Sequence, residues 1–162
     1  MKERVGIYPG SFDPITNGHL DILQRGLELF ETVIIAIAFN IEKQGLFTVE
    51  ERKELIRLSV KGNGNVIVDS FQGLLVDYVK RMNARFVIRG LRAMSDFEYE
   101  FQMASMNRNL NPEMDTVFMM TGKDFFFVSS RTIKEVASFG ASSKGCVPQV
   151  VEEALKNKFK HL

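Results

Sequence analysis

A short polar loop near the N-terminus has the residue types of an anion-binding site. The loop contains Ser11, Asn17 and Gly18, and it leads from an apolar run into a helical pattern that starts at His19. The first N–H groups of a helix lack partners within the helix, and the helix dipole is positive there, so such an end attracts anions. The glycine spacing fits neither a P-loop nor a dinucleotide-binding fingerprint. Taken alone, the loop is equally compatible with an ordinary turn between a strand and a helix.

Cationic side chains follow other apolar runs of the chain. Lys43 lies in the loop after residues 32–38, and Arg89 and Arg92 flank Gly90 at the end of a later run. The planar guanidinium group suits phosphate, although a solvated surface is the common alternative for such residues. The sequence offers no serine or cysteine nucleophile with a partnered base and no cluster of metal ligands. Cations and N–H donors without a nucleophile favour phosphoryl or nucleotidyl transfer, in which the protein positions substrates and stabilises charge.

Length and composition favour a single domain spanning residues 1–162. The formal net charge of +1 gives no basic field of the kind that nucleic-acid partners require. Cys146 is the only cysteine, so an intramolecular disulfide is excluded. The sequence has no signal-peptide pattern and no apolar run of about 18 residues, which would be needed for a membrane span. We therefore expect a cytoplasmic protein with no membrane or nucleic-acid partner.

Strand-like and helix-like segments alternate along the whole chain. Thr48 with Glu51 and Ser95 with Glu98 have the spacing of capping boxes, which predicts helix starts at both places. The alternation predicts an α/β fold, a Rossmann-like open parallel five-stranded sheet with helices on both faces. Ligands of such folds bind at the carboxyl ends of the strands, where the loops described above lie. The expected strands are residues 5–8, 32–38, 66–70, 86–89 and 116–120, and the expected helices are residues 19–30, 48–61, 74–82, 95–109, 129–138 and about 148–160.

Three motifs resemble those of a known enzyme family. The run GSFDPITNGH (residues 10–19) resembles the T/HxGH signature of the nucleotidyltransferase superfamily, with Thr16 in the position of the first histidine. The run VSSRTIK (residues 128–134) is similar to its second signature, ISSTxIR. The run IRGLRAMSDFEYEFQMASMN (residues 88–107) resembles the phosphopantetheine adenylyltransferases in particular. Motif order and spacing agree from residue 5 to about residue 136.

The resemblance implies a reaction and a set of site residues. The reaction is the reversible transfer of the adenylyl group of ATP to 4′-phosphopantetheine, giving dephospho-CoA and pyrophosphate in coenzyme A biosynthesis, with Mg²⁺ as cofactor and no protein metal ligand. By position in the motifs, the expected catalytic residues are His19, which would act at the ATP phosphates, Lys43 and Arg92. The expected ATP-binding residues are Ser11, Phe12, His19, Gly90, Leu91, Arg92, Glu100, Phe125, Phe126, Phe127, Val128, Ser129, Ser130 and Arg131. The expected phosphopantetheine-binding residues are Ser11, Lys43, Leu75, Arg89, Tyr99 and Asn107.

Two positions depart from the family pattern. Ser11 stands where many members have threonine, which keeps the hydroxyl group, and Arg131 stands where the superfamily has threonine and close relatives often have serine. The sequence leaves open whether the Arg131 side chain contacts a phosphate. The resemblance further implies a homohexamer and feedback inhibition by coenzyme A. A sibling transferase acting on glycerol phosphate or nicotinamide mononucleotide, and a catalytically silent nucleotide-binding or RNA-associated module, are the alternative hypotheses.

Overall fold

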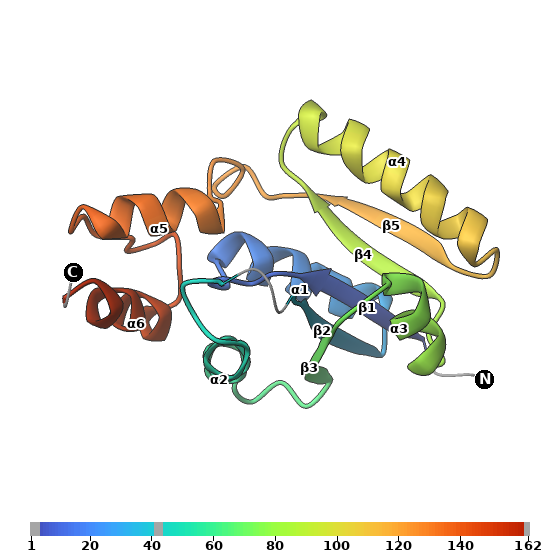
Figure 1. Ribbon diagram of the computed structural model, residues 1–162, viewed down its shortest axis with the longest axis horizontal. Coiled ribbons are helices and arrows are strands. Elements are labelled where there is room, and N and C mark those ends of the chain that lie inside the picture. The colour runs from blue at the N-terminus through green and yellow to red at the C-terminus, as the bar shows by residue number, and fades with distance from the viewer. Residues whose placement is uncertain (1–3, 41–43, 161–162) are drawn as a thin grey trace.

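The computed structural model describes residues 4–40 and 44–160 and has a parallel sheet at its centre (Figure 1). All neighbouring strands pair in parallel, in the order β3-β2-β1-β4-β5. The predicted fold class, a Rossmann-like α/β sheet, is confirmed. The strands are β1 (Val5–Gly10), β2 (Thr32–Ala38), β3 (Val66–Phe71), β4 (Phe86–Leu91) and β5 (Asp115–Met120).

Side chains of the central strands alternate between two apolar cores. In β2, Val33, Ile35 and Ile37 enter the larger core, whereas Ile34 and Ala36 enter the smaller core on the other face. Successive side chains of a strand point to opposite faces, so a strand covered on both faces must be apolar throughout. This requirement explains why residues 32–38 form an almost continuous apolar run.

Helices cover both faces of the sheet. α1 and α2 pack on the face of the larger core, with α5 and α6 beyond them, whereas α3 and α4 lie on the other side (Figure 1). The helices are α1 (Asn17–Leu29), α2 (Val49–Ser59), α3 (Leu75–Arg81), α4 (Met94–Leu110), α5 (Ser130–Ser138) and α6 (Gln149–Phe159).

The two predicted capping boxes have different outcomes. Thr48 and Glu51 form the predicted box at the start of α2, with each side chain bonded to the other residue's backbone N–H. The box predicted at Ser95 is wrong, because α4 begins one residue earlier and its N-cap residue, Ala93, makes no side-chain cap. Instead, a carboxylate oxygen of Asp96 accepts the backbone N–H of Arg92 at 3.2 Å.

A buried carboxylate joins the loop after β1 to two helices. Asp13 is 5% exposed, and it accepts the backbone N–H groups of Leu46 (3.0 Å) and Phe47 (2.9 Å) and the ammonium group of Lys134 (2.7 Å). Arg52 Nε lies 3.3 Å from the same carboxylate. Burial acts to raise the pKa of Asp13, but these four partners outweigh it and hold the pKa below its ordinary value. The loop that carries Ser11 is thereby fixed against α2 and α5.

Replacing Asp13 by asparagine tests this junction. The amide cannot accept hydrogen bonds with both of its heavy atoms and leaves Lys134 without its counter-ion, so we expect Asp13→Asn to lose roughly 3–5 kcal/mol of unfolding free energy at pH 7, measured by urea denaturation. The exposed Glu28→Gln variant serves as a control and should be unchanged.

The pH dependence of that difference has a definite sign. Because the folded-state pKa of Asp13 lies below its ordinary value of 3.8, the carboxylate contributes its full stability above that value and loses it as the pH falls through the folded-state pKa. The difference between wild type and Asp13→Asn should therefore shrink in acid. A difference that is independent of pH would contradict this account.

Candidate active site

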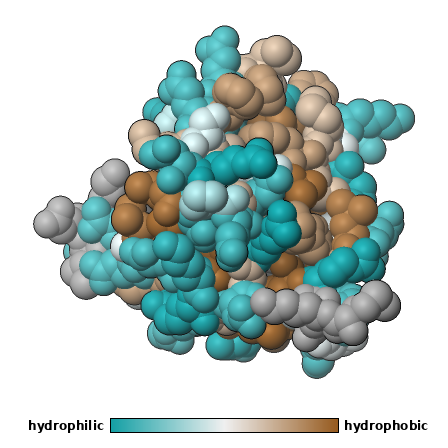
Figure 2. Space-filling model, turned by 90° about the vertical axis from the view of Figure 1, so that its right-hand side faces the viewer, coloured by the Kyte–Doolittle hydropathy of each residue, from teal (hydrophilic) through white to brown (hydrophobic). Residues whose placement is uncertain are grey.

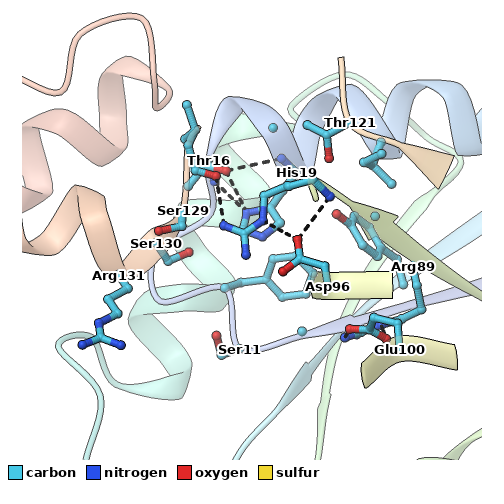
Figure 3. Close-up of a pocket in the computed structure, with 18 of the residues that line it drawn as sticks. Ser11, Thr16, His19, Arg89, Asp96, Glu100, Thr121, Ser129, Ser130 and Arg131 are labelled. Atoms are coloured by element: carbon cyan, nitrogen blue, oxygen red, sulfur yellow. Dashed lines mark hydrogen bonds and ion pairs between the residues drawn. The ribbon is translucent and has the colours of Figure 1, made fainter. Parts of the chain in front are cut away.

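A cavity of about 520 Å³ opens at the carboxyl ends of β1 and β4 (Figure 3). These strands flank the point where the strand order reverses, which is where open α/β sheets bind ligands. The cavity brings together many of the residues singled out in the sequence, from β1, β4, α1, α4 and the start of α5. The predicted site residues that line it are Ser11, Phe12, His19, Arg89, Gly90, Arg92, Tyr99, Glu100, Val128, Ser129, Ser130 and Arg131.

Other predicted site residues lie outside the lining of this cavity. Leu91 is buried at the end of β4, and Leu75 and Asn107 lie on α3 and α4. Lys43 lies outside the residues that the structure describes. The remaining three are Phe125, Phe126 and Phe127, in the loop between β5 and α5, of which the last two are exposed.

The His19 ring is part of the cap that starts α1. Its Nδ1 accepts the backbone N–H of Thr16 at 3.0 Å, while the Thr16 hydroxyl accepts the backbone N–H of His19 at 3.3 Å. Because Nδ1 is the acceptor, the neutral ring carries its proton on Nε2. Burial, followed by the positive charges of Arg92 and Arg89, lowers the pKa of His19 to about 4. At neutral pH the ring therefore offers Nε2–H, a hydrogen-bond donor, to a ligand in the cavity.

Two arginines of the cavity are held by carboxylates of α4. Arg89 pairs with Glu100 through two contacts, one of them from Nε to Oε2 at 2.7 Å, and donates from Nη1 to the carbonyl oxygen of Pro9 at 2.8 Å. Three of the five N–H donors of Arg89 are used in this way, so two are left for a ligand. Arg92 Nε donates to a carboxylate oxygen of Asp96 at 3.2 Å. Asp96 lies on α4 one helical turn before Glu100.

The sequence pointed to both arginines but missed their partners. Glu100 was expected on the ATP side, whereas here its carboxylate is engaged by Arg89, and Asp96 was not singled out. Thr16 was noted for its motif position but not as a cap. Its signal was present, because Thr16 and His19 have capping-box spacing with histidine in place of the usual Glu or Gln.

The loop after β1 and the start of α5 form the opposite wall. Ser129 caps α5 by accepting the backbone N–H of Thr132 at 3.0 Å, and the Ser130 hydroxyl donates to the carbonyl oxygen of Pro14 at 2.7 Å. Phe12 is 1% exposed, and its ring meets that of His19 edge-on, with centroids 5.0 Å apart. This wall therefore presents a helix N-terminus beside a rigid aromatic support.

Within the described residues, no group of three or more His, Cys, Asp or Glu side chains could hold a metal ion. The two α4 carboxylates in the cavity, Asp96 and Glu100, are both paired with arginine. These residues do not fit a metal site built by the protein alone. The same described part of the chain contains no helix that is long and apolar enough to cross a membrane.

Comparison with known proteins first gives the class of enzyme. Residues 7–136 match the family described as cytidylyltransferase-like, so the chain belongs to this class of nucleotidyltransferases. Curated relatives narrow the class. Two of these relatives are named phosphopantetheine adenylyltransferase. The one from Syntrophotalea carbinolica is 55% identical and the match covers 98% of this chain and 96% of the relative. The one from Anaeromyxobacter sp. is 57% identical and the match covers 96% of this chain and 94% of the relative. The chain belongs to the phosphopantetheine adenylyltransferase family.

Solved structures share the fold at low sequence identity. A putative nicotinate-nucleotide adenylyltransferase from Vibrio parahaemolyticus superposes with a TM-score of 0.72 at 15% identity, covering 96% of this chain and 99% of that one. A bifunctional NMN adenylyltransferase/ADP ribose pyrophosphatase from Francisella tularensis gives 0.71 at 18% identity, covering 99% of this chain and 52% of that one. The sheet and its helices are therefore those of nucleotidyltransferases.

The protonation state of His19 can be measured directly. We expect ¹⁵N NMR to place the ring proton on Nε2 from about pH 8 down to about pH 5, with titration only near the lowered pKa of about 4. A His161→Gln variant removes the signals of the only other histidine in the sequence. A His19 pKa near its ordinary value of 6.5 would contradict the capped, neutral ring.

Proposed function

We propose that this chain catalyses the reversible transfer of the adenylyl group from ATP to 4′-phosphopantetheine, giving dephospho-CoA and pyrophosphate in coenzyme A biosynthesis. The observation that carries this proposal is the cavity itself. It combines a neutral histidine donor, two arginines and a helix N-terminus, in a chain that is 55% identical to a phosphopantetheine adenylyltransferase. Such a set of donors stabilises phosphate charge and supplies no nucleophile of its own.

The reaction needs no general base. A substrate phosphate has a second pKa of about 6, so it is mostly a dianion at neutral pH and can attack the α-phosphorus of ATP directly. In this proposal His19 Nε2–H and Arg92 stabilise the ATP phosphates as charge shifts during transfer. The two free N–H donors of Arg89, together with Lys43, hold the phosphate of phosphopantetheine.

The remaining family positions complete the proposal. Ser11 contacts both substrates, and Leu75, Tyr99 and Asn107 line the pantetheine channel. Since Glu100 is paired with Arg89 in the free protein, an ATP contact from its carboxylate would have to coexist with that pair or replace it. The ATP side is completed by Phe12, Gly90, Leu91, Glu100, Phe125, Phe126, Phe127, Val128, Ser129, Ser130 and Arg131.

Mg²⁺ belongs to the proposal as a companion of the nucleotide. Magnesium in such sites keeps several waters and is often held largely by substrate phosphates. Because the described residues offer no carboxylate cluster, we propose that Mg²⁺ enters with ATP and that no side chain described here is its dedicated ligand. It would supply charge neutralisation on the triphosphate.

Pyrophosphate release tests the function. Purified protein with MgATP should release pyrophosphate only when 4′-phosphopantetheine is added. Replacing ATP by CTP, or phosphopantetheine by nicotinamide mononucleotide or glycerol phosphate, tests the sibling transferases. Turnover with one of those pairs, and none with ATP and phosphopantetheine, would overturn the proposal.

Coenzyme A added to the same assay tests the feedback inhibition that family resemblance implies. We further propose a cytoplasmic location, where coenzyme A synthesis would use the product.

Replacing His19 should remove catalysis without unfolding the protein. We expect His19→Ala to lower kcat by roughly 10²-fold or more, because alanine has no side-chain N–H donor. His19→Gln keeps an amide N–H donor, so it should lose less activity than His19→Ala. Glutamine at this helix position can still complete a capping box, so His19→Gln should keep the wild-type melting temperature. His161→Gln is the matched control, with unchanged kcat. Near-wild-type turnover of His19→Ala would rule out the proposed role.

Family resemblance suggests a homohexamer, and α4 supports self-association. No residue of α4 is buried, although the helix carries many large apolar side chains. Apolar side chains are exposed on the side of the molecule where α3 and α4 lie (Figure 2). Exposed apolar patches of this kind mark interaction sites. The exposed apolar residues of α4 are Met94, Phe97, Tyr99, Phe101, Met103, Met106 and Leu110.

Charged substitutions on α4 should break this assembly. We expect light scattering to give a wild-type mass six times that of one 18.4 kDa chain, and Phe101→Glu with Met106→Glu to lower it, because a buried charge is costly. Phe139→Glu, at the end of α5, is the control, since Phe139 is also exposed but lies on another element. A monomeric wild-type protein would refute the hexamer.

A further inference from the structure

A second cavity lies at the opposite edge of the sheet from the candidate active site. Its volume is about 700 Å³, within the roughly 300–1,000 Å³ typical of small-molecule sites. It opens at the amino ends of β1 and β4, whereas the first cavity opens at the carboxyl ends of the same strands. Figure 1 shows α3 and the start of β4 at the other end of the molecule from α5. Among the described residues none lines both cavities, so the function proposed above leaves this one without an occupant.

Positive charge is in excess around this second cavity. Three cationic side chains line it, those of Arg4, Lys80 and Arg85, together with one carboxylate, that of Glu113. Within the part of the chain that the structure describes, none of the three cations forms an ion pair or donates a side-chain hydrogen bond. By contrast, both arginines in the first cavity that come from the end of β4 have a carboxylate partner. Unpaired cations around a cavity suit an anionic ligand.

The two arginines are held by their backbones. The carbonyl oxygen of Arg4 accepts the backbone N–H of Glu31 at 2.9 Å, and the backbone N–H of Arg4 donates to the Glu31 carboxylate at 2.9 Å. The carbonyl oxygen of Arg85 accepts the backbone N–H of Asp115 at 2.9 Å. The Arg85 guanidinium also lies 5.5 Å from the centre of the Phe86 ring, which restricts its position. The backbone is thus fixed at the cavity while the charged groups stay available.

The helix ends near this cavity do not account for the two arginines. Lys80 lies in the last turn of α3, where the helix dipole favours a cation, and the last turn of α4 carries its own cation, Arg108. Arg4 and Arg85 precede strands instead, and sheets have only small net dipoles. The fold therefore gives no reason for the charge of these two arginines, and a bound anion would supply one.

A buried amide without a partner lines the same cavity. Asn111, the C-cap residue of α4, is 8% exposed. Its backbone N–H donates to the carbonyl oxygen of Asn107 at 2.8 Å, and its carbonyl oxygen accepts the backbone N–H of Met114 at 3.0 Å. Its side-chain amide makes no hydrogen bond with any described residue. Buried polar groups nearly always have a partner, so this amide requires one inside the cavity, and its NH₂ group can donate to an anion.

We propose that the second cavity binds a small oxyanion, a phosphate or carboxylate compound that carries at least two negative charges. Three cations against one carboxylate leave two positive charges in excess, which sets the charge of the ligand. The planar guanidinium groups of Arg4 and Arg85 suit phosphate and carboxylate oxygens alike, and the Asn111 amide adds an uncharged donor. The site lies away from the first cavity, so this inference goes beyond the proposed function and does not depend on it.

Chemical labelling read arginine by arginine tests the site in the intact protein. Phenylglyoxal reacts with exposed arginines, and peptide mass spectrometry reports each one separately. We expect tripolyphosphate to slow the labelling of Arg85 about 5-fold or more and that of Arg81 less than about 2-fold, because only a bound anion covers the guanidinium. Arg81 is a matched internal control: it is also exposed, and its guanidinium lies 5.1 Å from the centre of the Tyr78 ring, but it does not line the cavity. Equal slowing at both arginines would reveal general ionic screening and overturn the proposal.

Citrate in place of tripolyphosphate distinguishes the two classes of oxyanion. Protection of Arg85 by only one of these compounds would assign the site to phosphates or to carboxylates, and protection by both would support the shared chemistry. Protection by neither would overturn the proposal.

Calorimetry on variants gives the affinity for tripolyphosphate. Wild type should show two binding events, since the first cavity also suits phosphate, and the event that is weakened in Arg85→Ala belongs to the second cavity. We expect this weakening to be about 10-fold, with a smaller effect of Arg85→Lys, because lysine keeps the charge but not the planar fork. Arg81→Ala should bind as wild type does. Equal affinities of wild type and Arg85→Ala for both events would refute the site.

Replacing Asn111 separates binding from a structural role. Asn111→Leu keeps a similar volume and removes an amide that has no partner in the described part of the chain, so its melting temperature should equal or exceed that of wild type. The same variant should weaken the second binding event about 3-fold or more, because the anion loses an uncharged donor. A lower melting temperature with unchanged affinity would assign Asn111 to the fold and contradict its place in the site.

Discussion

The buried Asp13 carboxylate is the contact on which the geometry of the site depends. It lies in the loop after β1, and its partners lie before α2, in α2 and in α5, so one side chain fixes the relative position of segments far apart in the chain. The chain passes close by at Gly45, where a Cβ would lie 1.8 Å from Arg52 Nη2 and 2.9 Å from the Asp13 carboxylate. Any larger residue there would push Arg52 or Asp13 out of place. The loop that carries Ser11 and the helix that begins at Ser130 are held by this contact.

The fold could be predicted because each of its main signals is local. Residues 32–38 are apolar on both faces, the Thr48 capping box is complete, and helices separate the strands at regular spacing. Parallel strands then bring their carboxyl ends together, so the approximate position of the site followed from the same pattern. The start of α4 could not be predicted in this way, because Asp96, and not Ser95, makes the contact at that helix start.

The partners of the site residues could not be predicted from spacing. Arg89 and Glu100 are eleven positions apart, and whether a carboxylate faces a ligand or an arginine depends on how α4 is rotated against β4. Leu75 on α3 and Asn107 on α4, which family position places near a substrate, are likewise not among the residues that line the cavity. The lowered pKa of His19 could not be predicted from the sequence either, because it depends on the burial of the ring and on the charges of Arg92 and Arg89 at the end of β4.

Neutralisation by α4 explains how a phosphate site exists in a chain with a net charge of only +1. Glu100 and Asp96 compensate Arg89 and Arg92 in the free protein, which limits repulsion among cations around the cavity. Each arginine is also oriented by its partner before a ligand arrives, so less conformational entropy is lost on binding. The helix thus prepares both arginines from one side of the cavity.

The hydrogen bond from the Thr16 backbone to His19 Nδ1 limits which reactions this scaffold can support. The only basic nitrogen of the neutral ring, Nδ1, accepts the backbone N–H of Thr16 at the start of α1. His19 can therefore donate a hydrogen bond from Nε2–H but cannot accept a proton from a nucleophile. An alcohol or amine acceptor would find no base in this residue, whereas an ionised phosphate requires none. The His19 side chain therefore couples the start of α1 to the kind of substrate that can accept the transferred group. A variant enzyme able to activate a hydroxyl group would first have to give up the cap that begins its helix.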